Sequence, residues 1–378
     1  MKKALITGGC GFIGSYVVEK FLKEGYKIAV VDILDYAASP EHFWERLQKT
    51  KRIFSRPPIL TEDPTEAGTR RFSHLGYELR RRNLKEFEKS IEAYPVVIVH
   101  ASIGERNVVR GLLENFKPQK IVNLAALTHV DTSIEKPESF LRINTEETFL
   151  FFQEILRYQK AKQRTAIVHV STDEVYGSSN GQNLFKETSP LLPGNPYSAS
   201  KASAEMFLIS LSNTYSLKVR VARPCNALGP GQNPEKLIPK TITKALKNQH
   251  IPLYGDGKHR REWLYAGDTA EAIYRIAELD EKRVPQIEGY PKGYVPFNIG
   301  SGNYVENLQL VKKILSILGK GEELINFVED RPGHDRFYGV DFSFLQKTTG
   351  WKPSVDLENA LKETINWYRK NIDSVSTD

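Results

Sequence analysis

Two short stretches of the sequence carry side chains whose types and spacing could do acid–base chemistry. Thr172, Asp173 and Glu174 are consecutive, and Tyr197 and Lys201 are four residues apart. On a helix, a spacing of four places Tyr197 and Lys201 on one face. An ammonium group stabilises a neighbouring phenolate, so we expect the pKa of Tyr197 to fall towards that of a useful general base. An acid, a carboxylate base and an activated tyrosine in one cleft offer more chemistry than the oxidation of an alcohol requires.

Each stretch also has a simpler interpretation. Tyr-x-x-x-Lys pairs are common on solvated helices, and the run from Thr172 to Glu174 could cap a helix, because acidic residues favour the first turn. The catalytic interpretation is favoured because both stretches occur, in this order, in a chain that begins with a nucleotide-binding signature.

The elements that must position these side chains alternate between strands and helices. The apolar, β-branched run 165–170 predicts a buried strand, so Thr172 to Glu174 lie at or just past its C-terminal end, where ligands bind in an open parallel sheet. Further strands are predicted at 2–7, 27–31, 95–100, 120–125 and 218–222, and helices at 15–23, 106–116 and around Asn144 to about Tyr158. We therefore predict an α/β fold with a doubly wound parallel sheet of the Rossmann type and a smaller C-terminal α/β domain.

The nucleotide-binding signature follows the first strand, where Gly8, Gly11 and Gly14 are spaced three apart. Glycines at a strand-to-helix turn allow a tight bend, the approach of a pyrophosphate to the backbone and close packing of the helix on the strand. The second strand ends in Asp32, whose carboxylate would accept hydrogen bonds from ribose hydroxyls and repel a 2′-phosphate, which favours NAD over NADP. Asp35 is the less favoured candidate for this role. We expect cofactor contacts from Gly8, Gly11, Phe12, Ile13, Gly14, Asp32, Ser102, Ile103, Ala125, Ala126, Tyr197 and Lys201.

Length and composition suit a globular protein with an ample core. The chain has 378 residues, of which 40% are hydrophobic and 26% charged. No run approaches the roughly 18 apolar residues of a membrane helix, and the N-terminus enters a strand without a signal peptide. Two cysteines provide no disulfide framework, and no Cys/His cluster has zinc spacing. We expect a cytoplasmic protein without a metal, and neither nucleic acid nor a membrane as partner.

Residues from about 40 to 92 interrupt the alternation of strands and helices. Between residues 42 and 85 there are 11 Lys or Arg and 5 Asp or Glu, a net charge of +6 out of +7 for the chain. The simpler interpretation is a solvated insertion that serves as a lid or an oligomer contact, and the alternative is an element that binds anionic groups of a ligand. Because the segment follows Asp32, our hypothesis is that it covers the adenosine end of the cofactor and slows its release.

The last third of the chain places basic residues among turns. Lys236, Arg261 and Arg331 together suit a diphosphate, because arginine can hold phosphate oxygens with two parallel hydrogen bonds. We predict a cofactor domain at 1–225, which contains the basic insertion, and a mainly substrate-binding domain at 226–378. Segments near 263–275 and 296–300 are expected to return to the first domain.

These motifs together resemble those of the extended short-chain dehydrogenase/reductases, and among them the dTDP-glucose 4,6-dehydratases. The glycine and Tyr-x-x-x-Lys motifs mark only the superfamily, whereas Thr-Asp-Glu followed by Val-Tyr-Gly is more specific to the dehydratases. The resemblance covers nearly the whole chain apart from about 40–92. It implies a nucleotide-sugar 4,6-dehydratase, a hydro-lyase of deoxysugar biosynthesis that recycles NAD within its site and acts on an NDP-hexose, most often dTDP-glucose. It also implies a homodimer, with helices 145–158 and 198–211 in a four-helix interface.

The resemblance also implies a role for each residue of the two stretches. Tyr197, helped by Lys201 and Thr172, would remove the proton of the sugar's 4-hydroxyl while hydride passes to NAD. Glu174 would then abstract the hydrogen at carbon 5, and a protonated Asp173 would donate to the departing 6-hydroxyl, which requires environments that push the two pKa values apart. Substrate contacts are expected from Thr128, His129, Asn226, Glu235, Lys236, Leu237, Arg261, Asn298, Arg331 and His334.

Two positions depart from the pattern of that family. Leu127 stands where an acidic residue is usual, and Ala227 follows Asn226 where a second asparagine is usual. Both border the expected sugar pocket, so a UDP-sugar or a 2-acetamido sugar stays open beside dTDP-glucose. Two alternatives within enzymes are a nucleotide-sugar 4-epimerase and a UDP-glucuronate decarboxylase on the same fold, neither of which needs the Asp–Glu pair. A catalytically silent NAD-binding regulator is the alternative from another class.

Overall fold

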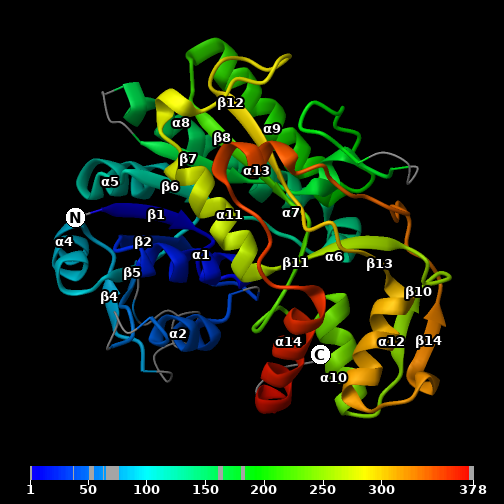
Figure 1. Ribbon diagram of the computed structural model, residues 1–378. Helices are drawn as coiled ribbons and strands as arrows, with labels where there is room; N and C mark the ends of the chain where they lie inside the picture. The colour runs from blue at the N-terminus through cyan, green and yellow to red at the C-terminus, as the bar shows by residue number, and fades with distance from the viewer. Residues whose placement is uncertain are drawn as a thin grey trace.

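Parallel strands form the centre of the molecule (Figure 1). The computed structural model describes residues 2–36, 38–50, 55–62, 64, 76–160, 165–179 and 184–373. Within these ranges the strands of the large sheet are β1 (Lys3–Thr7), β2 (Lys27–Asp32), β3 (Ile59–Thr61), β4 (Leu79–Arg81), β5 (Val96–His100), β6 (Lys120–Asn123), β7 (Ala166–Val170), β8 (Val219–Pro224) and β12 (Tyr294–Ile299). Their order is β12–β8–β7–β6–β1–β2–β5–β3–β4, and every neighbouring pair is parallel. The predicted doubly wound sheet is confirmed.

Helices cover both faces of this sheet, which explains why its strands are apolar on both sides. Alternate residues of β2 point to opposite faces: Ile28 and Val30 pack in one core cluster, and Ala29 and Val31 in another. The first face is covered by α1 (Phe12–Lys23) and α11 (Ala266–Glu278), and the second by α4 (Leu84–Ala93), α5 (Arg106–Phe116), α8 (Thr148–Lys160) and α9 (Pro196–Tyr215). The site is therefore built on rigid elements.

The basic segment between β2 and β5 adds structure at one edge of the sheet. It contributes α2 (Pro40–Gln48), the short strands β3 and β4, and α4. Strand β3 pairs with β5 and β4 with β3, so the insertion extends the sheet beyond the strand that the alternation predicts. Each added strand has only three residues, too short for an alternating pattern to stand out in the sequence. Some of the basic residues counted above, such as those at 70 and 71, lie outside the described residues.

A second, smaller body of structure holds its own apolar core (Figure 1). Its strands are β9 (Asn226–Leu228), β10 (Ile251–Tyr254), β11 (Arg260–Tyr265), β13 (Tyr304–Glu306) and β14 (Ile325–Val328), and its helices are α10 (Leu237–Leu246), α12 (Asn307–Leu318) and α14 (Leu357–Asn371). The strands pair as β13–β11–β9 and β10–β14. Two segments from this part of the sequence lie against the large sheet: β12 pairs with β8, and α11 packs on α1.

The remaining helices are short. They are α6 (Val130–Glu135), α7 (Pro137–Phe140), the π-helical turn η1 (Leu141–Glu147), the 3₁₀ turns η2 (Asp173–Tyr176), η3 (Glu281–Arg283) and η4 (Glu322–Leu324), and α13 (Ser343–Thr349). Three of them, α6, η1 and η2, contribute residues to the cleft described below. The helix predicted around Asn144 therefore begins with a π-turn, and β8 runs two residues beyond the predicted end at Ala222. Within the described ranges, no helix is both long enough and apolar enough to cross a membrane.

Candidate active site

A cleft at the C-terminal ends of the strands runs from the glycine turn to the second body. Its first part is lined by every residue expected to contact the cofactor, together with Thr172, Asp173 and Glu174. Its second part is lined by every residue expected to contact the substrate except Asn298. Thr128, Glu174, Asn226, Gln232 and Lys236 line both parts. Glu174 thus lies where the two parts meet.

The glycine turn can pack closely against its own backbone neighbours only because its residues lack side chains. Gly8 has φ +64°, and a Cβ there would lie 2.7 Å from the backbone nitrogen of Ala125. A Cβ on Gly14 would lie 2.0 Å from the carbonyl oxygen of Gly8. Helix α1 can therefore begin directly against the turn, and its first residues, Phe12, Ile13 and Gly14, line the cleft. A helix N-terminus beside a glycine turn is the arrangement that binds a pyrophosphate. This cradle fits a dinucleotide.

Asp32 lies at the end of β2 with its carboxylate held by two backbone amides. Cys10 N and Leu34 N each donate to it at 2.9 Å. Burial raises the pKa of Asp32 to about 6, against the lowering effect of these two hydrogen bonds. The group is ionised at neutral pH, and its oxygens keep lone pairs for ribose hydroxyls.

Helix α9 places Tyr197 and Lys201 on the wall of the cleft. Its start is fixed by Asn195, whose side chain accepts from Ser198 N in a capping box. The Lys201 ammonium donates to the carbonyl oxygen of Val170 at 2.8 Å, and burial lowers its pKa to about 8. The expectation of a lowered pKa for Tyr197 is wrong for this structure. Burial raises the pKa of Tyr197, as does the charge of Glu174, and only a hydrogen bond with Thr172 opposes them.

The two carboxyl groups stand on the 3₁₀ turn η2, directly after β7. Thr172 caps this turn, because its hydroxyl oxygen accepts from Glu174 N at 3.3 Å. The Asp173 side chain is buried, and burial and the nearby Glu174 and Glu262 raise its pKa well above the usual value. Among the described residues, Asp173 Oδ2 has no hydrogen-bond partner. The other oxygen, Oδ1, accepts a single hydrogen bond within the described part of the chain, from Thr172 Oγ1 at 3.3 Å. A buried carboxyl with so few donors is most stable with its proton on.

A buried polar network supports η2 from behind. Tyr176 donates to Asn298 Oδ1 at 2.7 Å and accepts from Arg223 at 2.6 Å, and Arg223 pairs with Glu205 at 2.6 Å. The Asn298 side chain also donates to the carbonyl oxygens of Phe185 and Asp341, so its hydrogen-bonding groups are in use away from the cleft. Its predicted place in the substrate site is therefore wrong, and Asn298 anchors the turn that carries the two carboxyls.

Cationic side chains converge on the second part of the cleft. Arg331 Nη1 donates to Asp131 at 2.9 Å, and Arg331 Nε is buried without a partner among the described residues. Arg261 lies over the Tyr338 ring at 4.3 Å, and Lys236 Nζ donates to the carbonyl oxygen of Thr128. These charges can receive a diphosphate.

Some residues of this part were not predicted from the sequence. They include Asn307, Tyr254, Tyr338 and Trp263. Asn307 begins α12, and its buried Oδ1 has no partner within the described residues. An asparagine at the start of a helix is usually a cap, so the sequence held no signal of a binding role.

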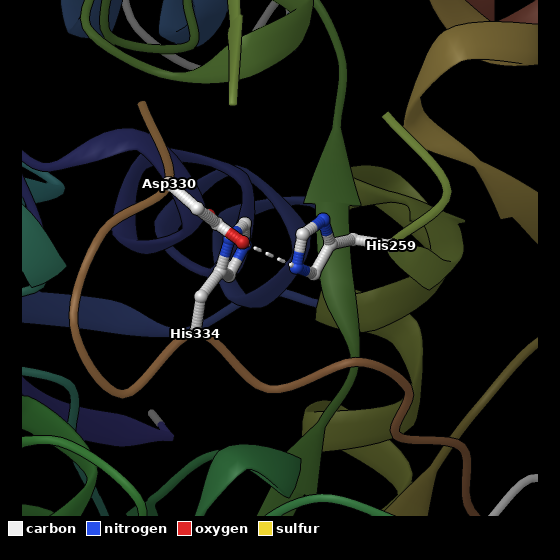
Figure 2. A group of neighbouring side chains, drawn as sticks. All are labelled: His259, Asp330 and His334. Carbon is white, nitrogen blue, oxygen red and sulfur yellow. Dashed lines mark hydrogen bonds and ion pairs between the residues drawn. The ribbon is translucent and has the colours of Figure 1, made fainter. Parts of the chain in front are cut away.

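His259, Asp330 and His334 form the one group in the described part of the chain with the composition of a metal site (Figure 2). Asp330 lies 3.2 Å from His259 Nε2 and 2.6 Å from His334 Nδ1. The two imidazole rings are stacked, with centroids 3.7 Å apart and planes at 15°. A metal binds an imidazole in the ring plane, and two nearly parallel planes do not meet at one ion. As placed, the group is a hydrogen-bonded cluster in which one carboxylate orients both rings, and His334 lines the substrate part of the cleft.

Comparison with known proteins identifies the family. The profile of the GDP-mannose 4,6 dehydratase family matches residues 57–364. The dTDP-glucose 4,6-dehydratase of Xanthomonas campestris pv. campestris (strain B100) is 32% identical over 381 residues, which cover 97% of this chain and 93% of that protein. The chain belongs to this dehydratase family. The predicted enzyme class, an NAD-dependent hydro-lyase of nucleotide sugars, is confirmed with it.

Solved structures agree with this membership. DesIV, the dTDP-glucose 4,6-dehydratase of Streptomyces venezuelae, was crystallised with NAD; it has a TM-score of 0.77 and 31% identity, over 98% of each chain. The enzyme from Bacillus anthracis str. Ames, also in complex with NAD, has a TM-score of 0.74 and 31% identity, over 99% of this chain and 98% of that one. The UDP-glucose 4-epimerase of Thermotoga maritima has a TM-score of 0.75 but 24% identity, over 98% and 99% of the chains, and shares the fold alone. NAD is the cofactor of this dehydratase.

Proposed function

We propose that this dehydratase converts dTDP-glucose to the 4-keto-6-deoxy sugar nucleotide, with the division of labour that the sequence predicts. The observation that carries the proposal is the buried Asp173, whose raised pKa keeps a proton available beside Glu174, at the junction of the two parts of the cleft. A neutral acid next to a second carboxyl is what the elimination of water requires and what an epimerase does not need. The names of the relatives support dTDP-glucose as the substrate.

Each side chain then has one task. Tyr197 in its deprotonated form takes the proton of the 4-hydroxyl, and the hydrogen bond with Thr172 favours that form against the effect of burial. NAD, when bound, accepts the hydride of carbon 4 and later returns it to carbon 6. The 4-ketone acidifies the hydrogen at carbon 5, which Glu174 removes as a proton, and Asp173 gives its proton to the 6-hydroxyl, which leaves as water. When hydride returns to carbon 6, Glu174 gives its proton back to carbon 5. Burial around Asp173 keeps bulk water from taking this proton first.

Binding follows from the two parts of the cleft. The amides of the glycine turn hold the pyrophosphate of NAD, and Asp32 holds its adenosine ribose. Lys236, Arg261 and Arg331 hold the diphosphate of the sugar nucleotide, which places the hexose over Glu174. Leu127 and Ala227 make the neighbouring wall of the cleft less polar than the residues usual at these positions in the family. For this reason the test includes nucleotide sugars other than dTDP-glucose.

The test is an incubation of the purified protein with dTDP-glucose, UDP-glucose, GDP-mannose and UDP-N-acetylglucosamine, each read by mass. We expect dTDP-glucose to lose one water without added reductant. An unchanged mass with an altered sugar configuration would instead identify an epimerase. Faster loss of water from another nucleotide sugar would replace the proposed substrate and leave the reaction in place.

We also propose a cytoplasmic homodimer. Met206 and Phe207 of α9 are 48% and 45% exposed and lie within 198–211, one of the two helices expected at a four-helix interface. Leu141 of η1 and Tyr215 at the end of α9 are 59% and 51% exposed and lie just outside the expected ranges 145–158 and 198–211. Phe149 of α8 packs against Phe207 with ring centroids 5.0 Å apart, so the exposed surface spans neighbouring helices. Such a patch favours burial against a second copy.

A further inference from the structure

The basic insertion touches the cofactor cleft from outside rather than lining it. None of its described residues between 40 and 92 belongs to the lining of the cofactor part, whereas Asp35 and Ala38, just before α2, do. The described part of the insertion therefore forms no cover over the adenosine. Two of its arginines, Arg46 and Arg82, instead make hydrogen bonds beside loops that line the cleft.

Arg82, directly after β4, holds the loop that follows β5. Its guanidinium donates to the carbonyl oxygen of His100 at 2.8 Å and to Glu105 at 2.9 Å, and it also pairs with Glu62. Glu105 in turn accepts from Ser102 N at 2.9 Å. Ser102 lies in the lining of the cofactor part, so Arg82 fixes the loop under the adenosine end from behind.

Arg46, on α2, joins the first turns of α1 to the loop before α10. Its Nε donates to Ser15 Oγ at 3.1 Å and its Nη2 to the carbonyl oxygen of Pro230 at 2.9 Å. The guanidinium lies 3.2 Å from the centre of the Tyr16 ring, and Tyr16 donates to the same carbonyl at 3.1 Å. Two residues further, Gln232 lines both parts of the cleft. Arg46 thus ties the pyrophosphate-binding helix to the loop that closes the other side.

We propose that Arg46 and Arg82 are positioning residues through which the insertion slows the release of NAD. A bound dinucleotide leaves when the adenosine loop moves or when the two sides of the cleft separate. Each arginine makes charge-assisted hydrogen bonds to a loop whose movement would break them. Slow release costs the enzyme nothing, because its cofactor returns to the starting state in every turnover. Arg46 and Arg82 thereby act on protein groups rather than on a ligand phosphate.

The test is the exchange of bound NAD for isotope-labelled NAD, measured by mass in the holoenzyme. We expect Arg82→Gln and Arg46→Met to exchange about tenfold faster or more, as fits the loss of hydrogen bonds to a charged group. The matched controls are Arg81→Gln, an exposed neighbour of Arg82, and Lys49→Met, an exposed residue just after α2; both should exchange at the rate of the parent. Because no sugar is present, the outcome does not depend on the substrate.

Further measurements separate positioning from folding. At saturating NAD, kcat of Arg82→Gln should match the parent, while the NAD concentration that gives half-maximal activity of the apoprotein rises. Arg46 is buried, so Arg46→Met could also disturb folding, and Arg46→Lys provides a second variant. Lysine keeps the charge but lacks the several fixed donors of the guanidinium, so this variant should release NAD at an intermediate rate. Equal exchange rates for Arg82→Gln, Arg46→Lys and the two controls would overturn the proposal. So would a lower kcat at saturating NAD with unchanged exchange.

Discussion

Asp32 and Asp173 are both buried carboxyls of the cleft, yet their surroundings suit opposite tasks. Two backbone amides donate to Asp32, so burial raises its pKa only to about 6 and it is ionised at neutral pH. Asp173 has no such donors, and Glu174 and Glu262 add their charges to the effect of burial. These surroundings fit the proposed roles, in which Asp32 accepts from ribose hydroxyls and Asp173 gives a proton.

Replacement of Asp173 by asparagine should separate oxidation from elimination. The amide keeps the shape but cannot donate the acidic proton, so loss of water should slow by about 10²–10⁴-fold while oxidation at carbon 4 persists. Absorbance at the wavelength of NADH should rise on mixing with substrate and decay slowly. Asp256→Asn, which removes an exposed ion pair with Arg336, is the control. Elimination at the parent rate in Asp173→Asn would assign the acid to another residue.

The binding of NAD to the apoprotein should weaken in acid through Asp32. Its ionised form accepts from the ribose, and this form is lost as the pH falls through about 6. Between pH 7 and pH 5 we expect the Kd for NAD to rise by about tenfold, in step with the ionised fraction. Isothermal titration measures this, and Asp32→Asn should bind more weakly at pH 7 and lose most of the dependence. An equally steep pH profile in Asp32→Asn would point to a different titrating group.

At the scale of the element, η2 depends on contacts with chain segments far from it in the sequence. Tyr176 reaches Arg223 and Asn298, which stand on β8 and β12. The turn thus receives its orientation from the sheet rather than from its own four residues. This network holds Asp173 and Glu174 against the cleft wall that carries Tyr197.

Replacement of Tyr176 by phenylalanine should loosen this turn. The change removes the hydroxyl that donates to Asn298 and accepts from Arg223, so both buried side chains lose a hydrogen-bond partner. The free energy of unfolding should therefore fall by about 1–3 kcal/mol. Turnover should also slow, with NADH accumulating as elimination lags behind oxidation. Urea unfolding measures the first effect. Tyr94→Phe, which removes a more exposed hydrogen bond to Glu78, should have the smaller effect on stability and none on turnover. A larger loss of stability or turnover in Tyr94→Phe than in Tyr176→Phe would show that Tyr176 does not support the turn.

At the scale of the whole molecule, the cleft lies between two bodies that the insertion and α11 join. Helix α11 comes from the last third of the chain but packs on α1, and α2 approaches α14 through the His42 and Trp367 rings, 4.4 Å apart. The boundary at residue 225 stays a prediction, because the chain crosses between the two bodies more than once. A cofactor held at such a junction is retained as long as the bodies stay together.

Introduction of a charge on the exposed face of α9 should disrupt assembly. Phe207→Glu places a carboxylate in the proposed interface. Burial of this unpaired charge would disfavour association, and the apolar contact of Phe207 would be lost as well. Light scattering should give the mass of a dimer for the parent and of a monomer for the variant. Leu192→Glu, which changes an apolar residue 70% exposed before α9, should stay dimeric. A monomeric parent at all concentrations would contradict the homodimer.

Local patterns in the sequence determined the class of fold and the cofactor, and they supplied the proposed catalytic residues. Apolar runs, glycine spacing and the Tyr-x-x-x-Lys motif are readable within a few residues, because strands, tight turns and helix faces are local structures. The tertiary structure decided what depends on contacts between distant segments. It buried Tyr197 and so raised its pKa, and it turned Asn298 away from the cleft and brought Asn307 into it. It also made part of the basic insertion two strands of the sheet and directed Arg46 and Arg82 towards protein groups. The burial of a side chain and its hydrogen-bond partners depend on how distant segments pack together, so they could not be predicted from the spacing of residues along the chain.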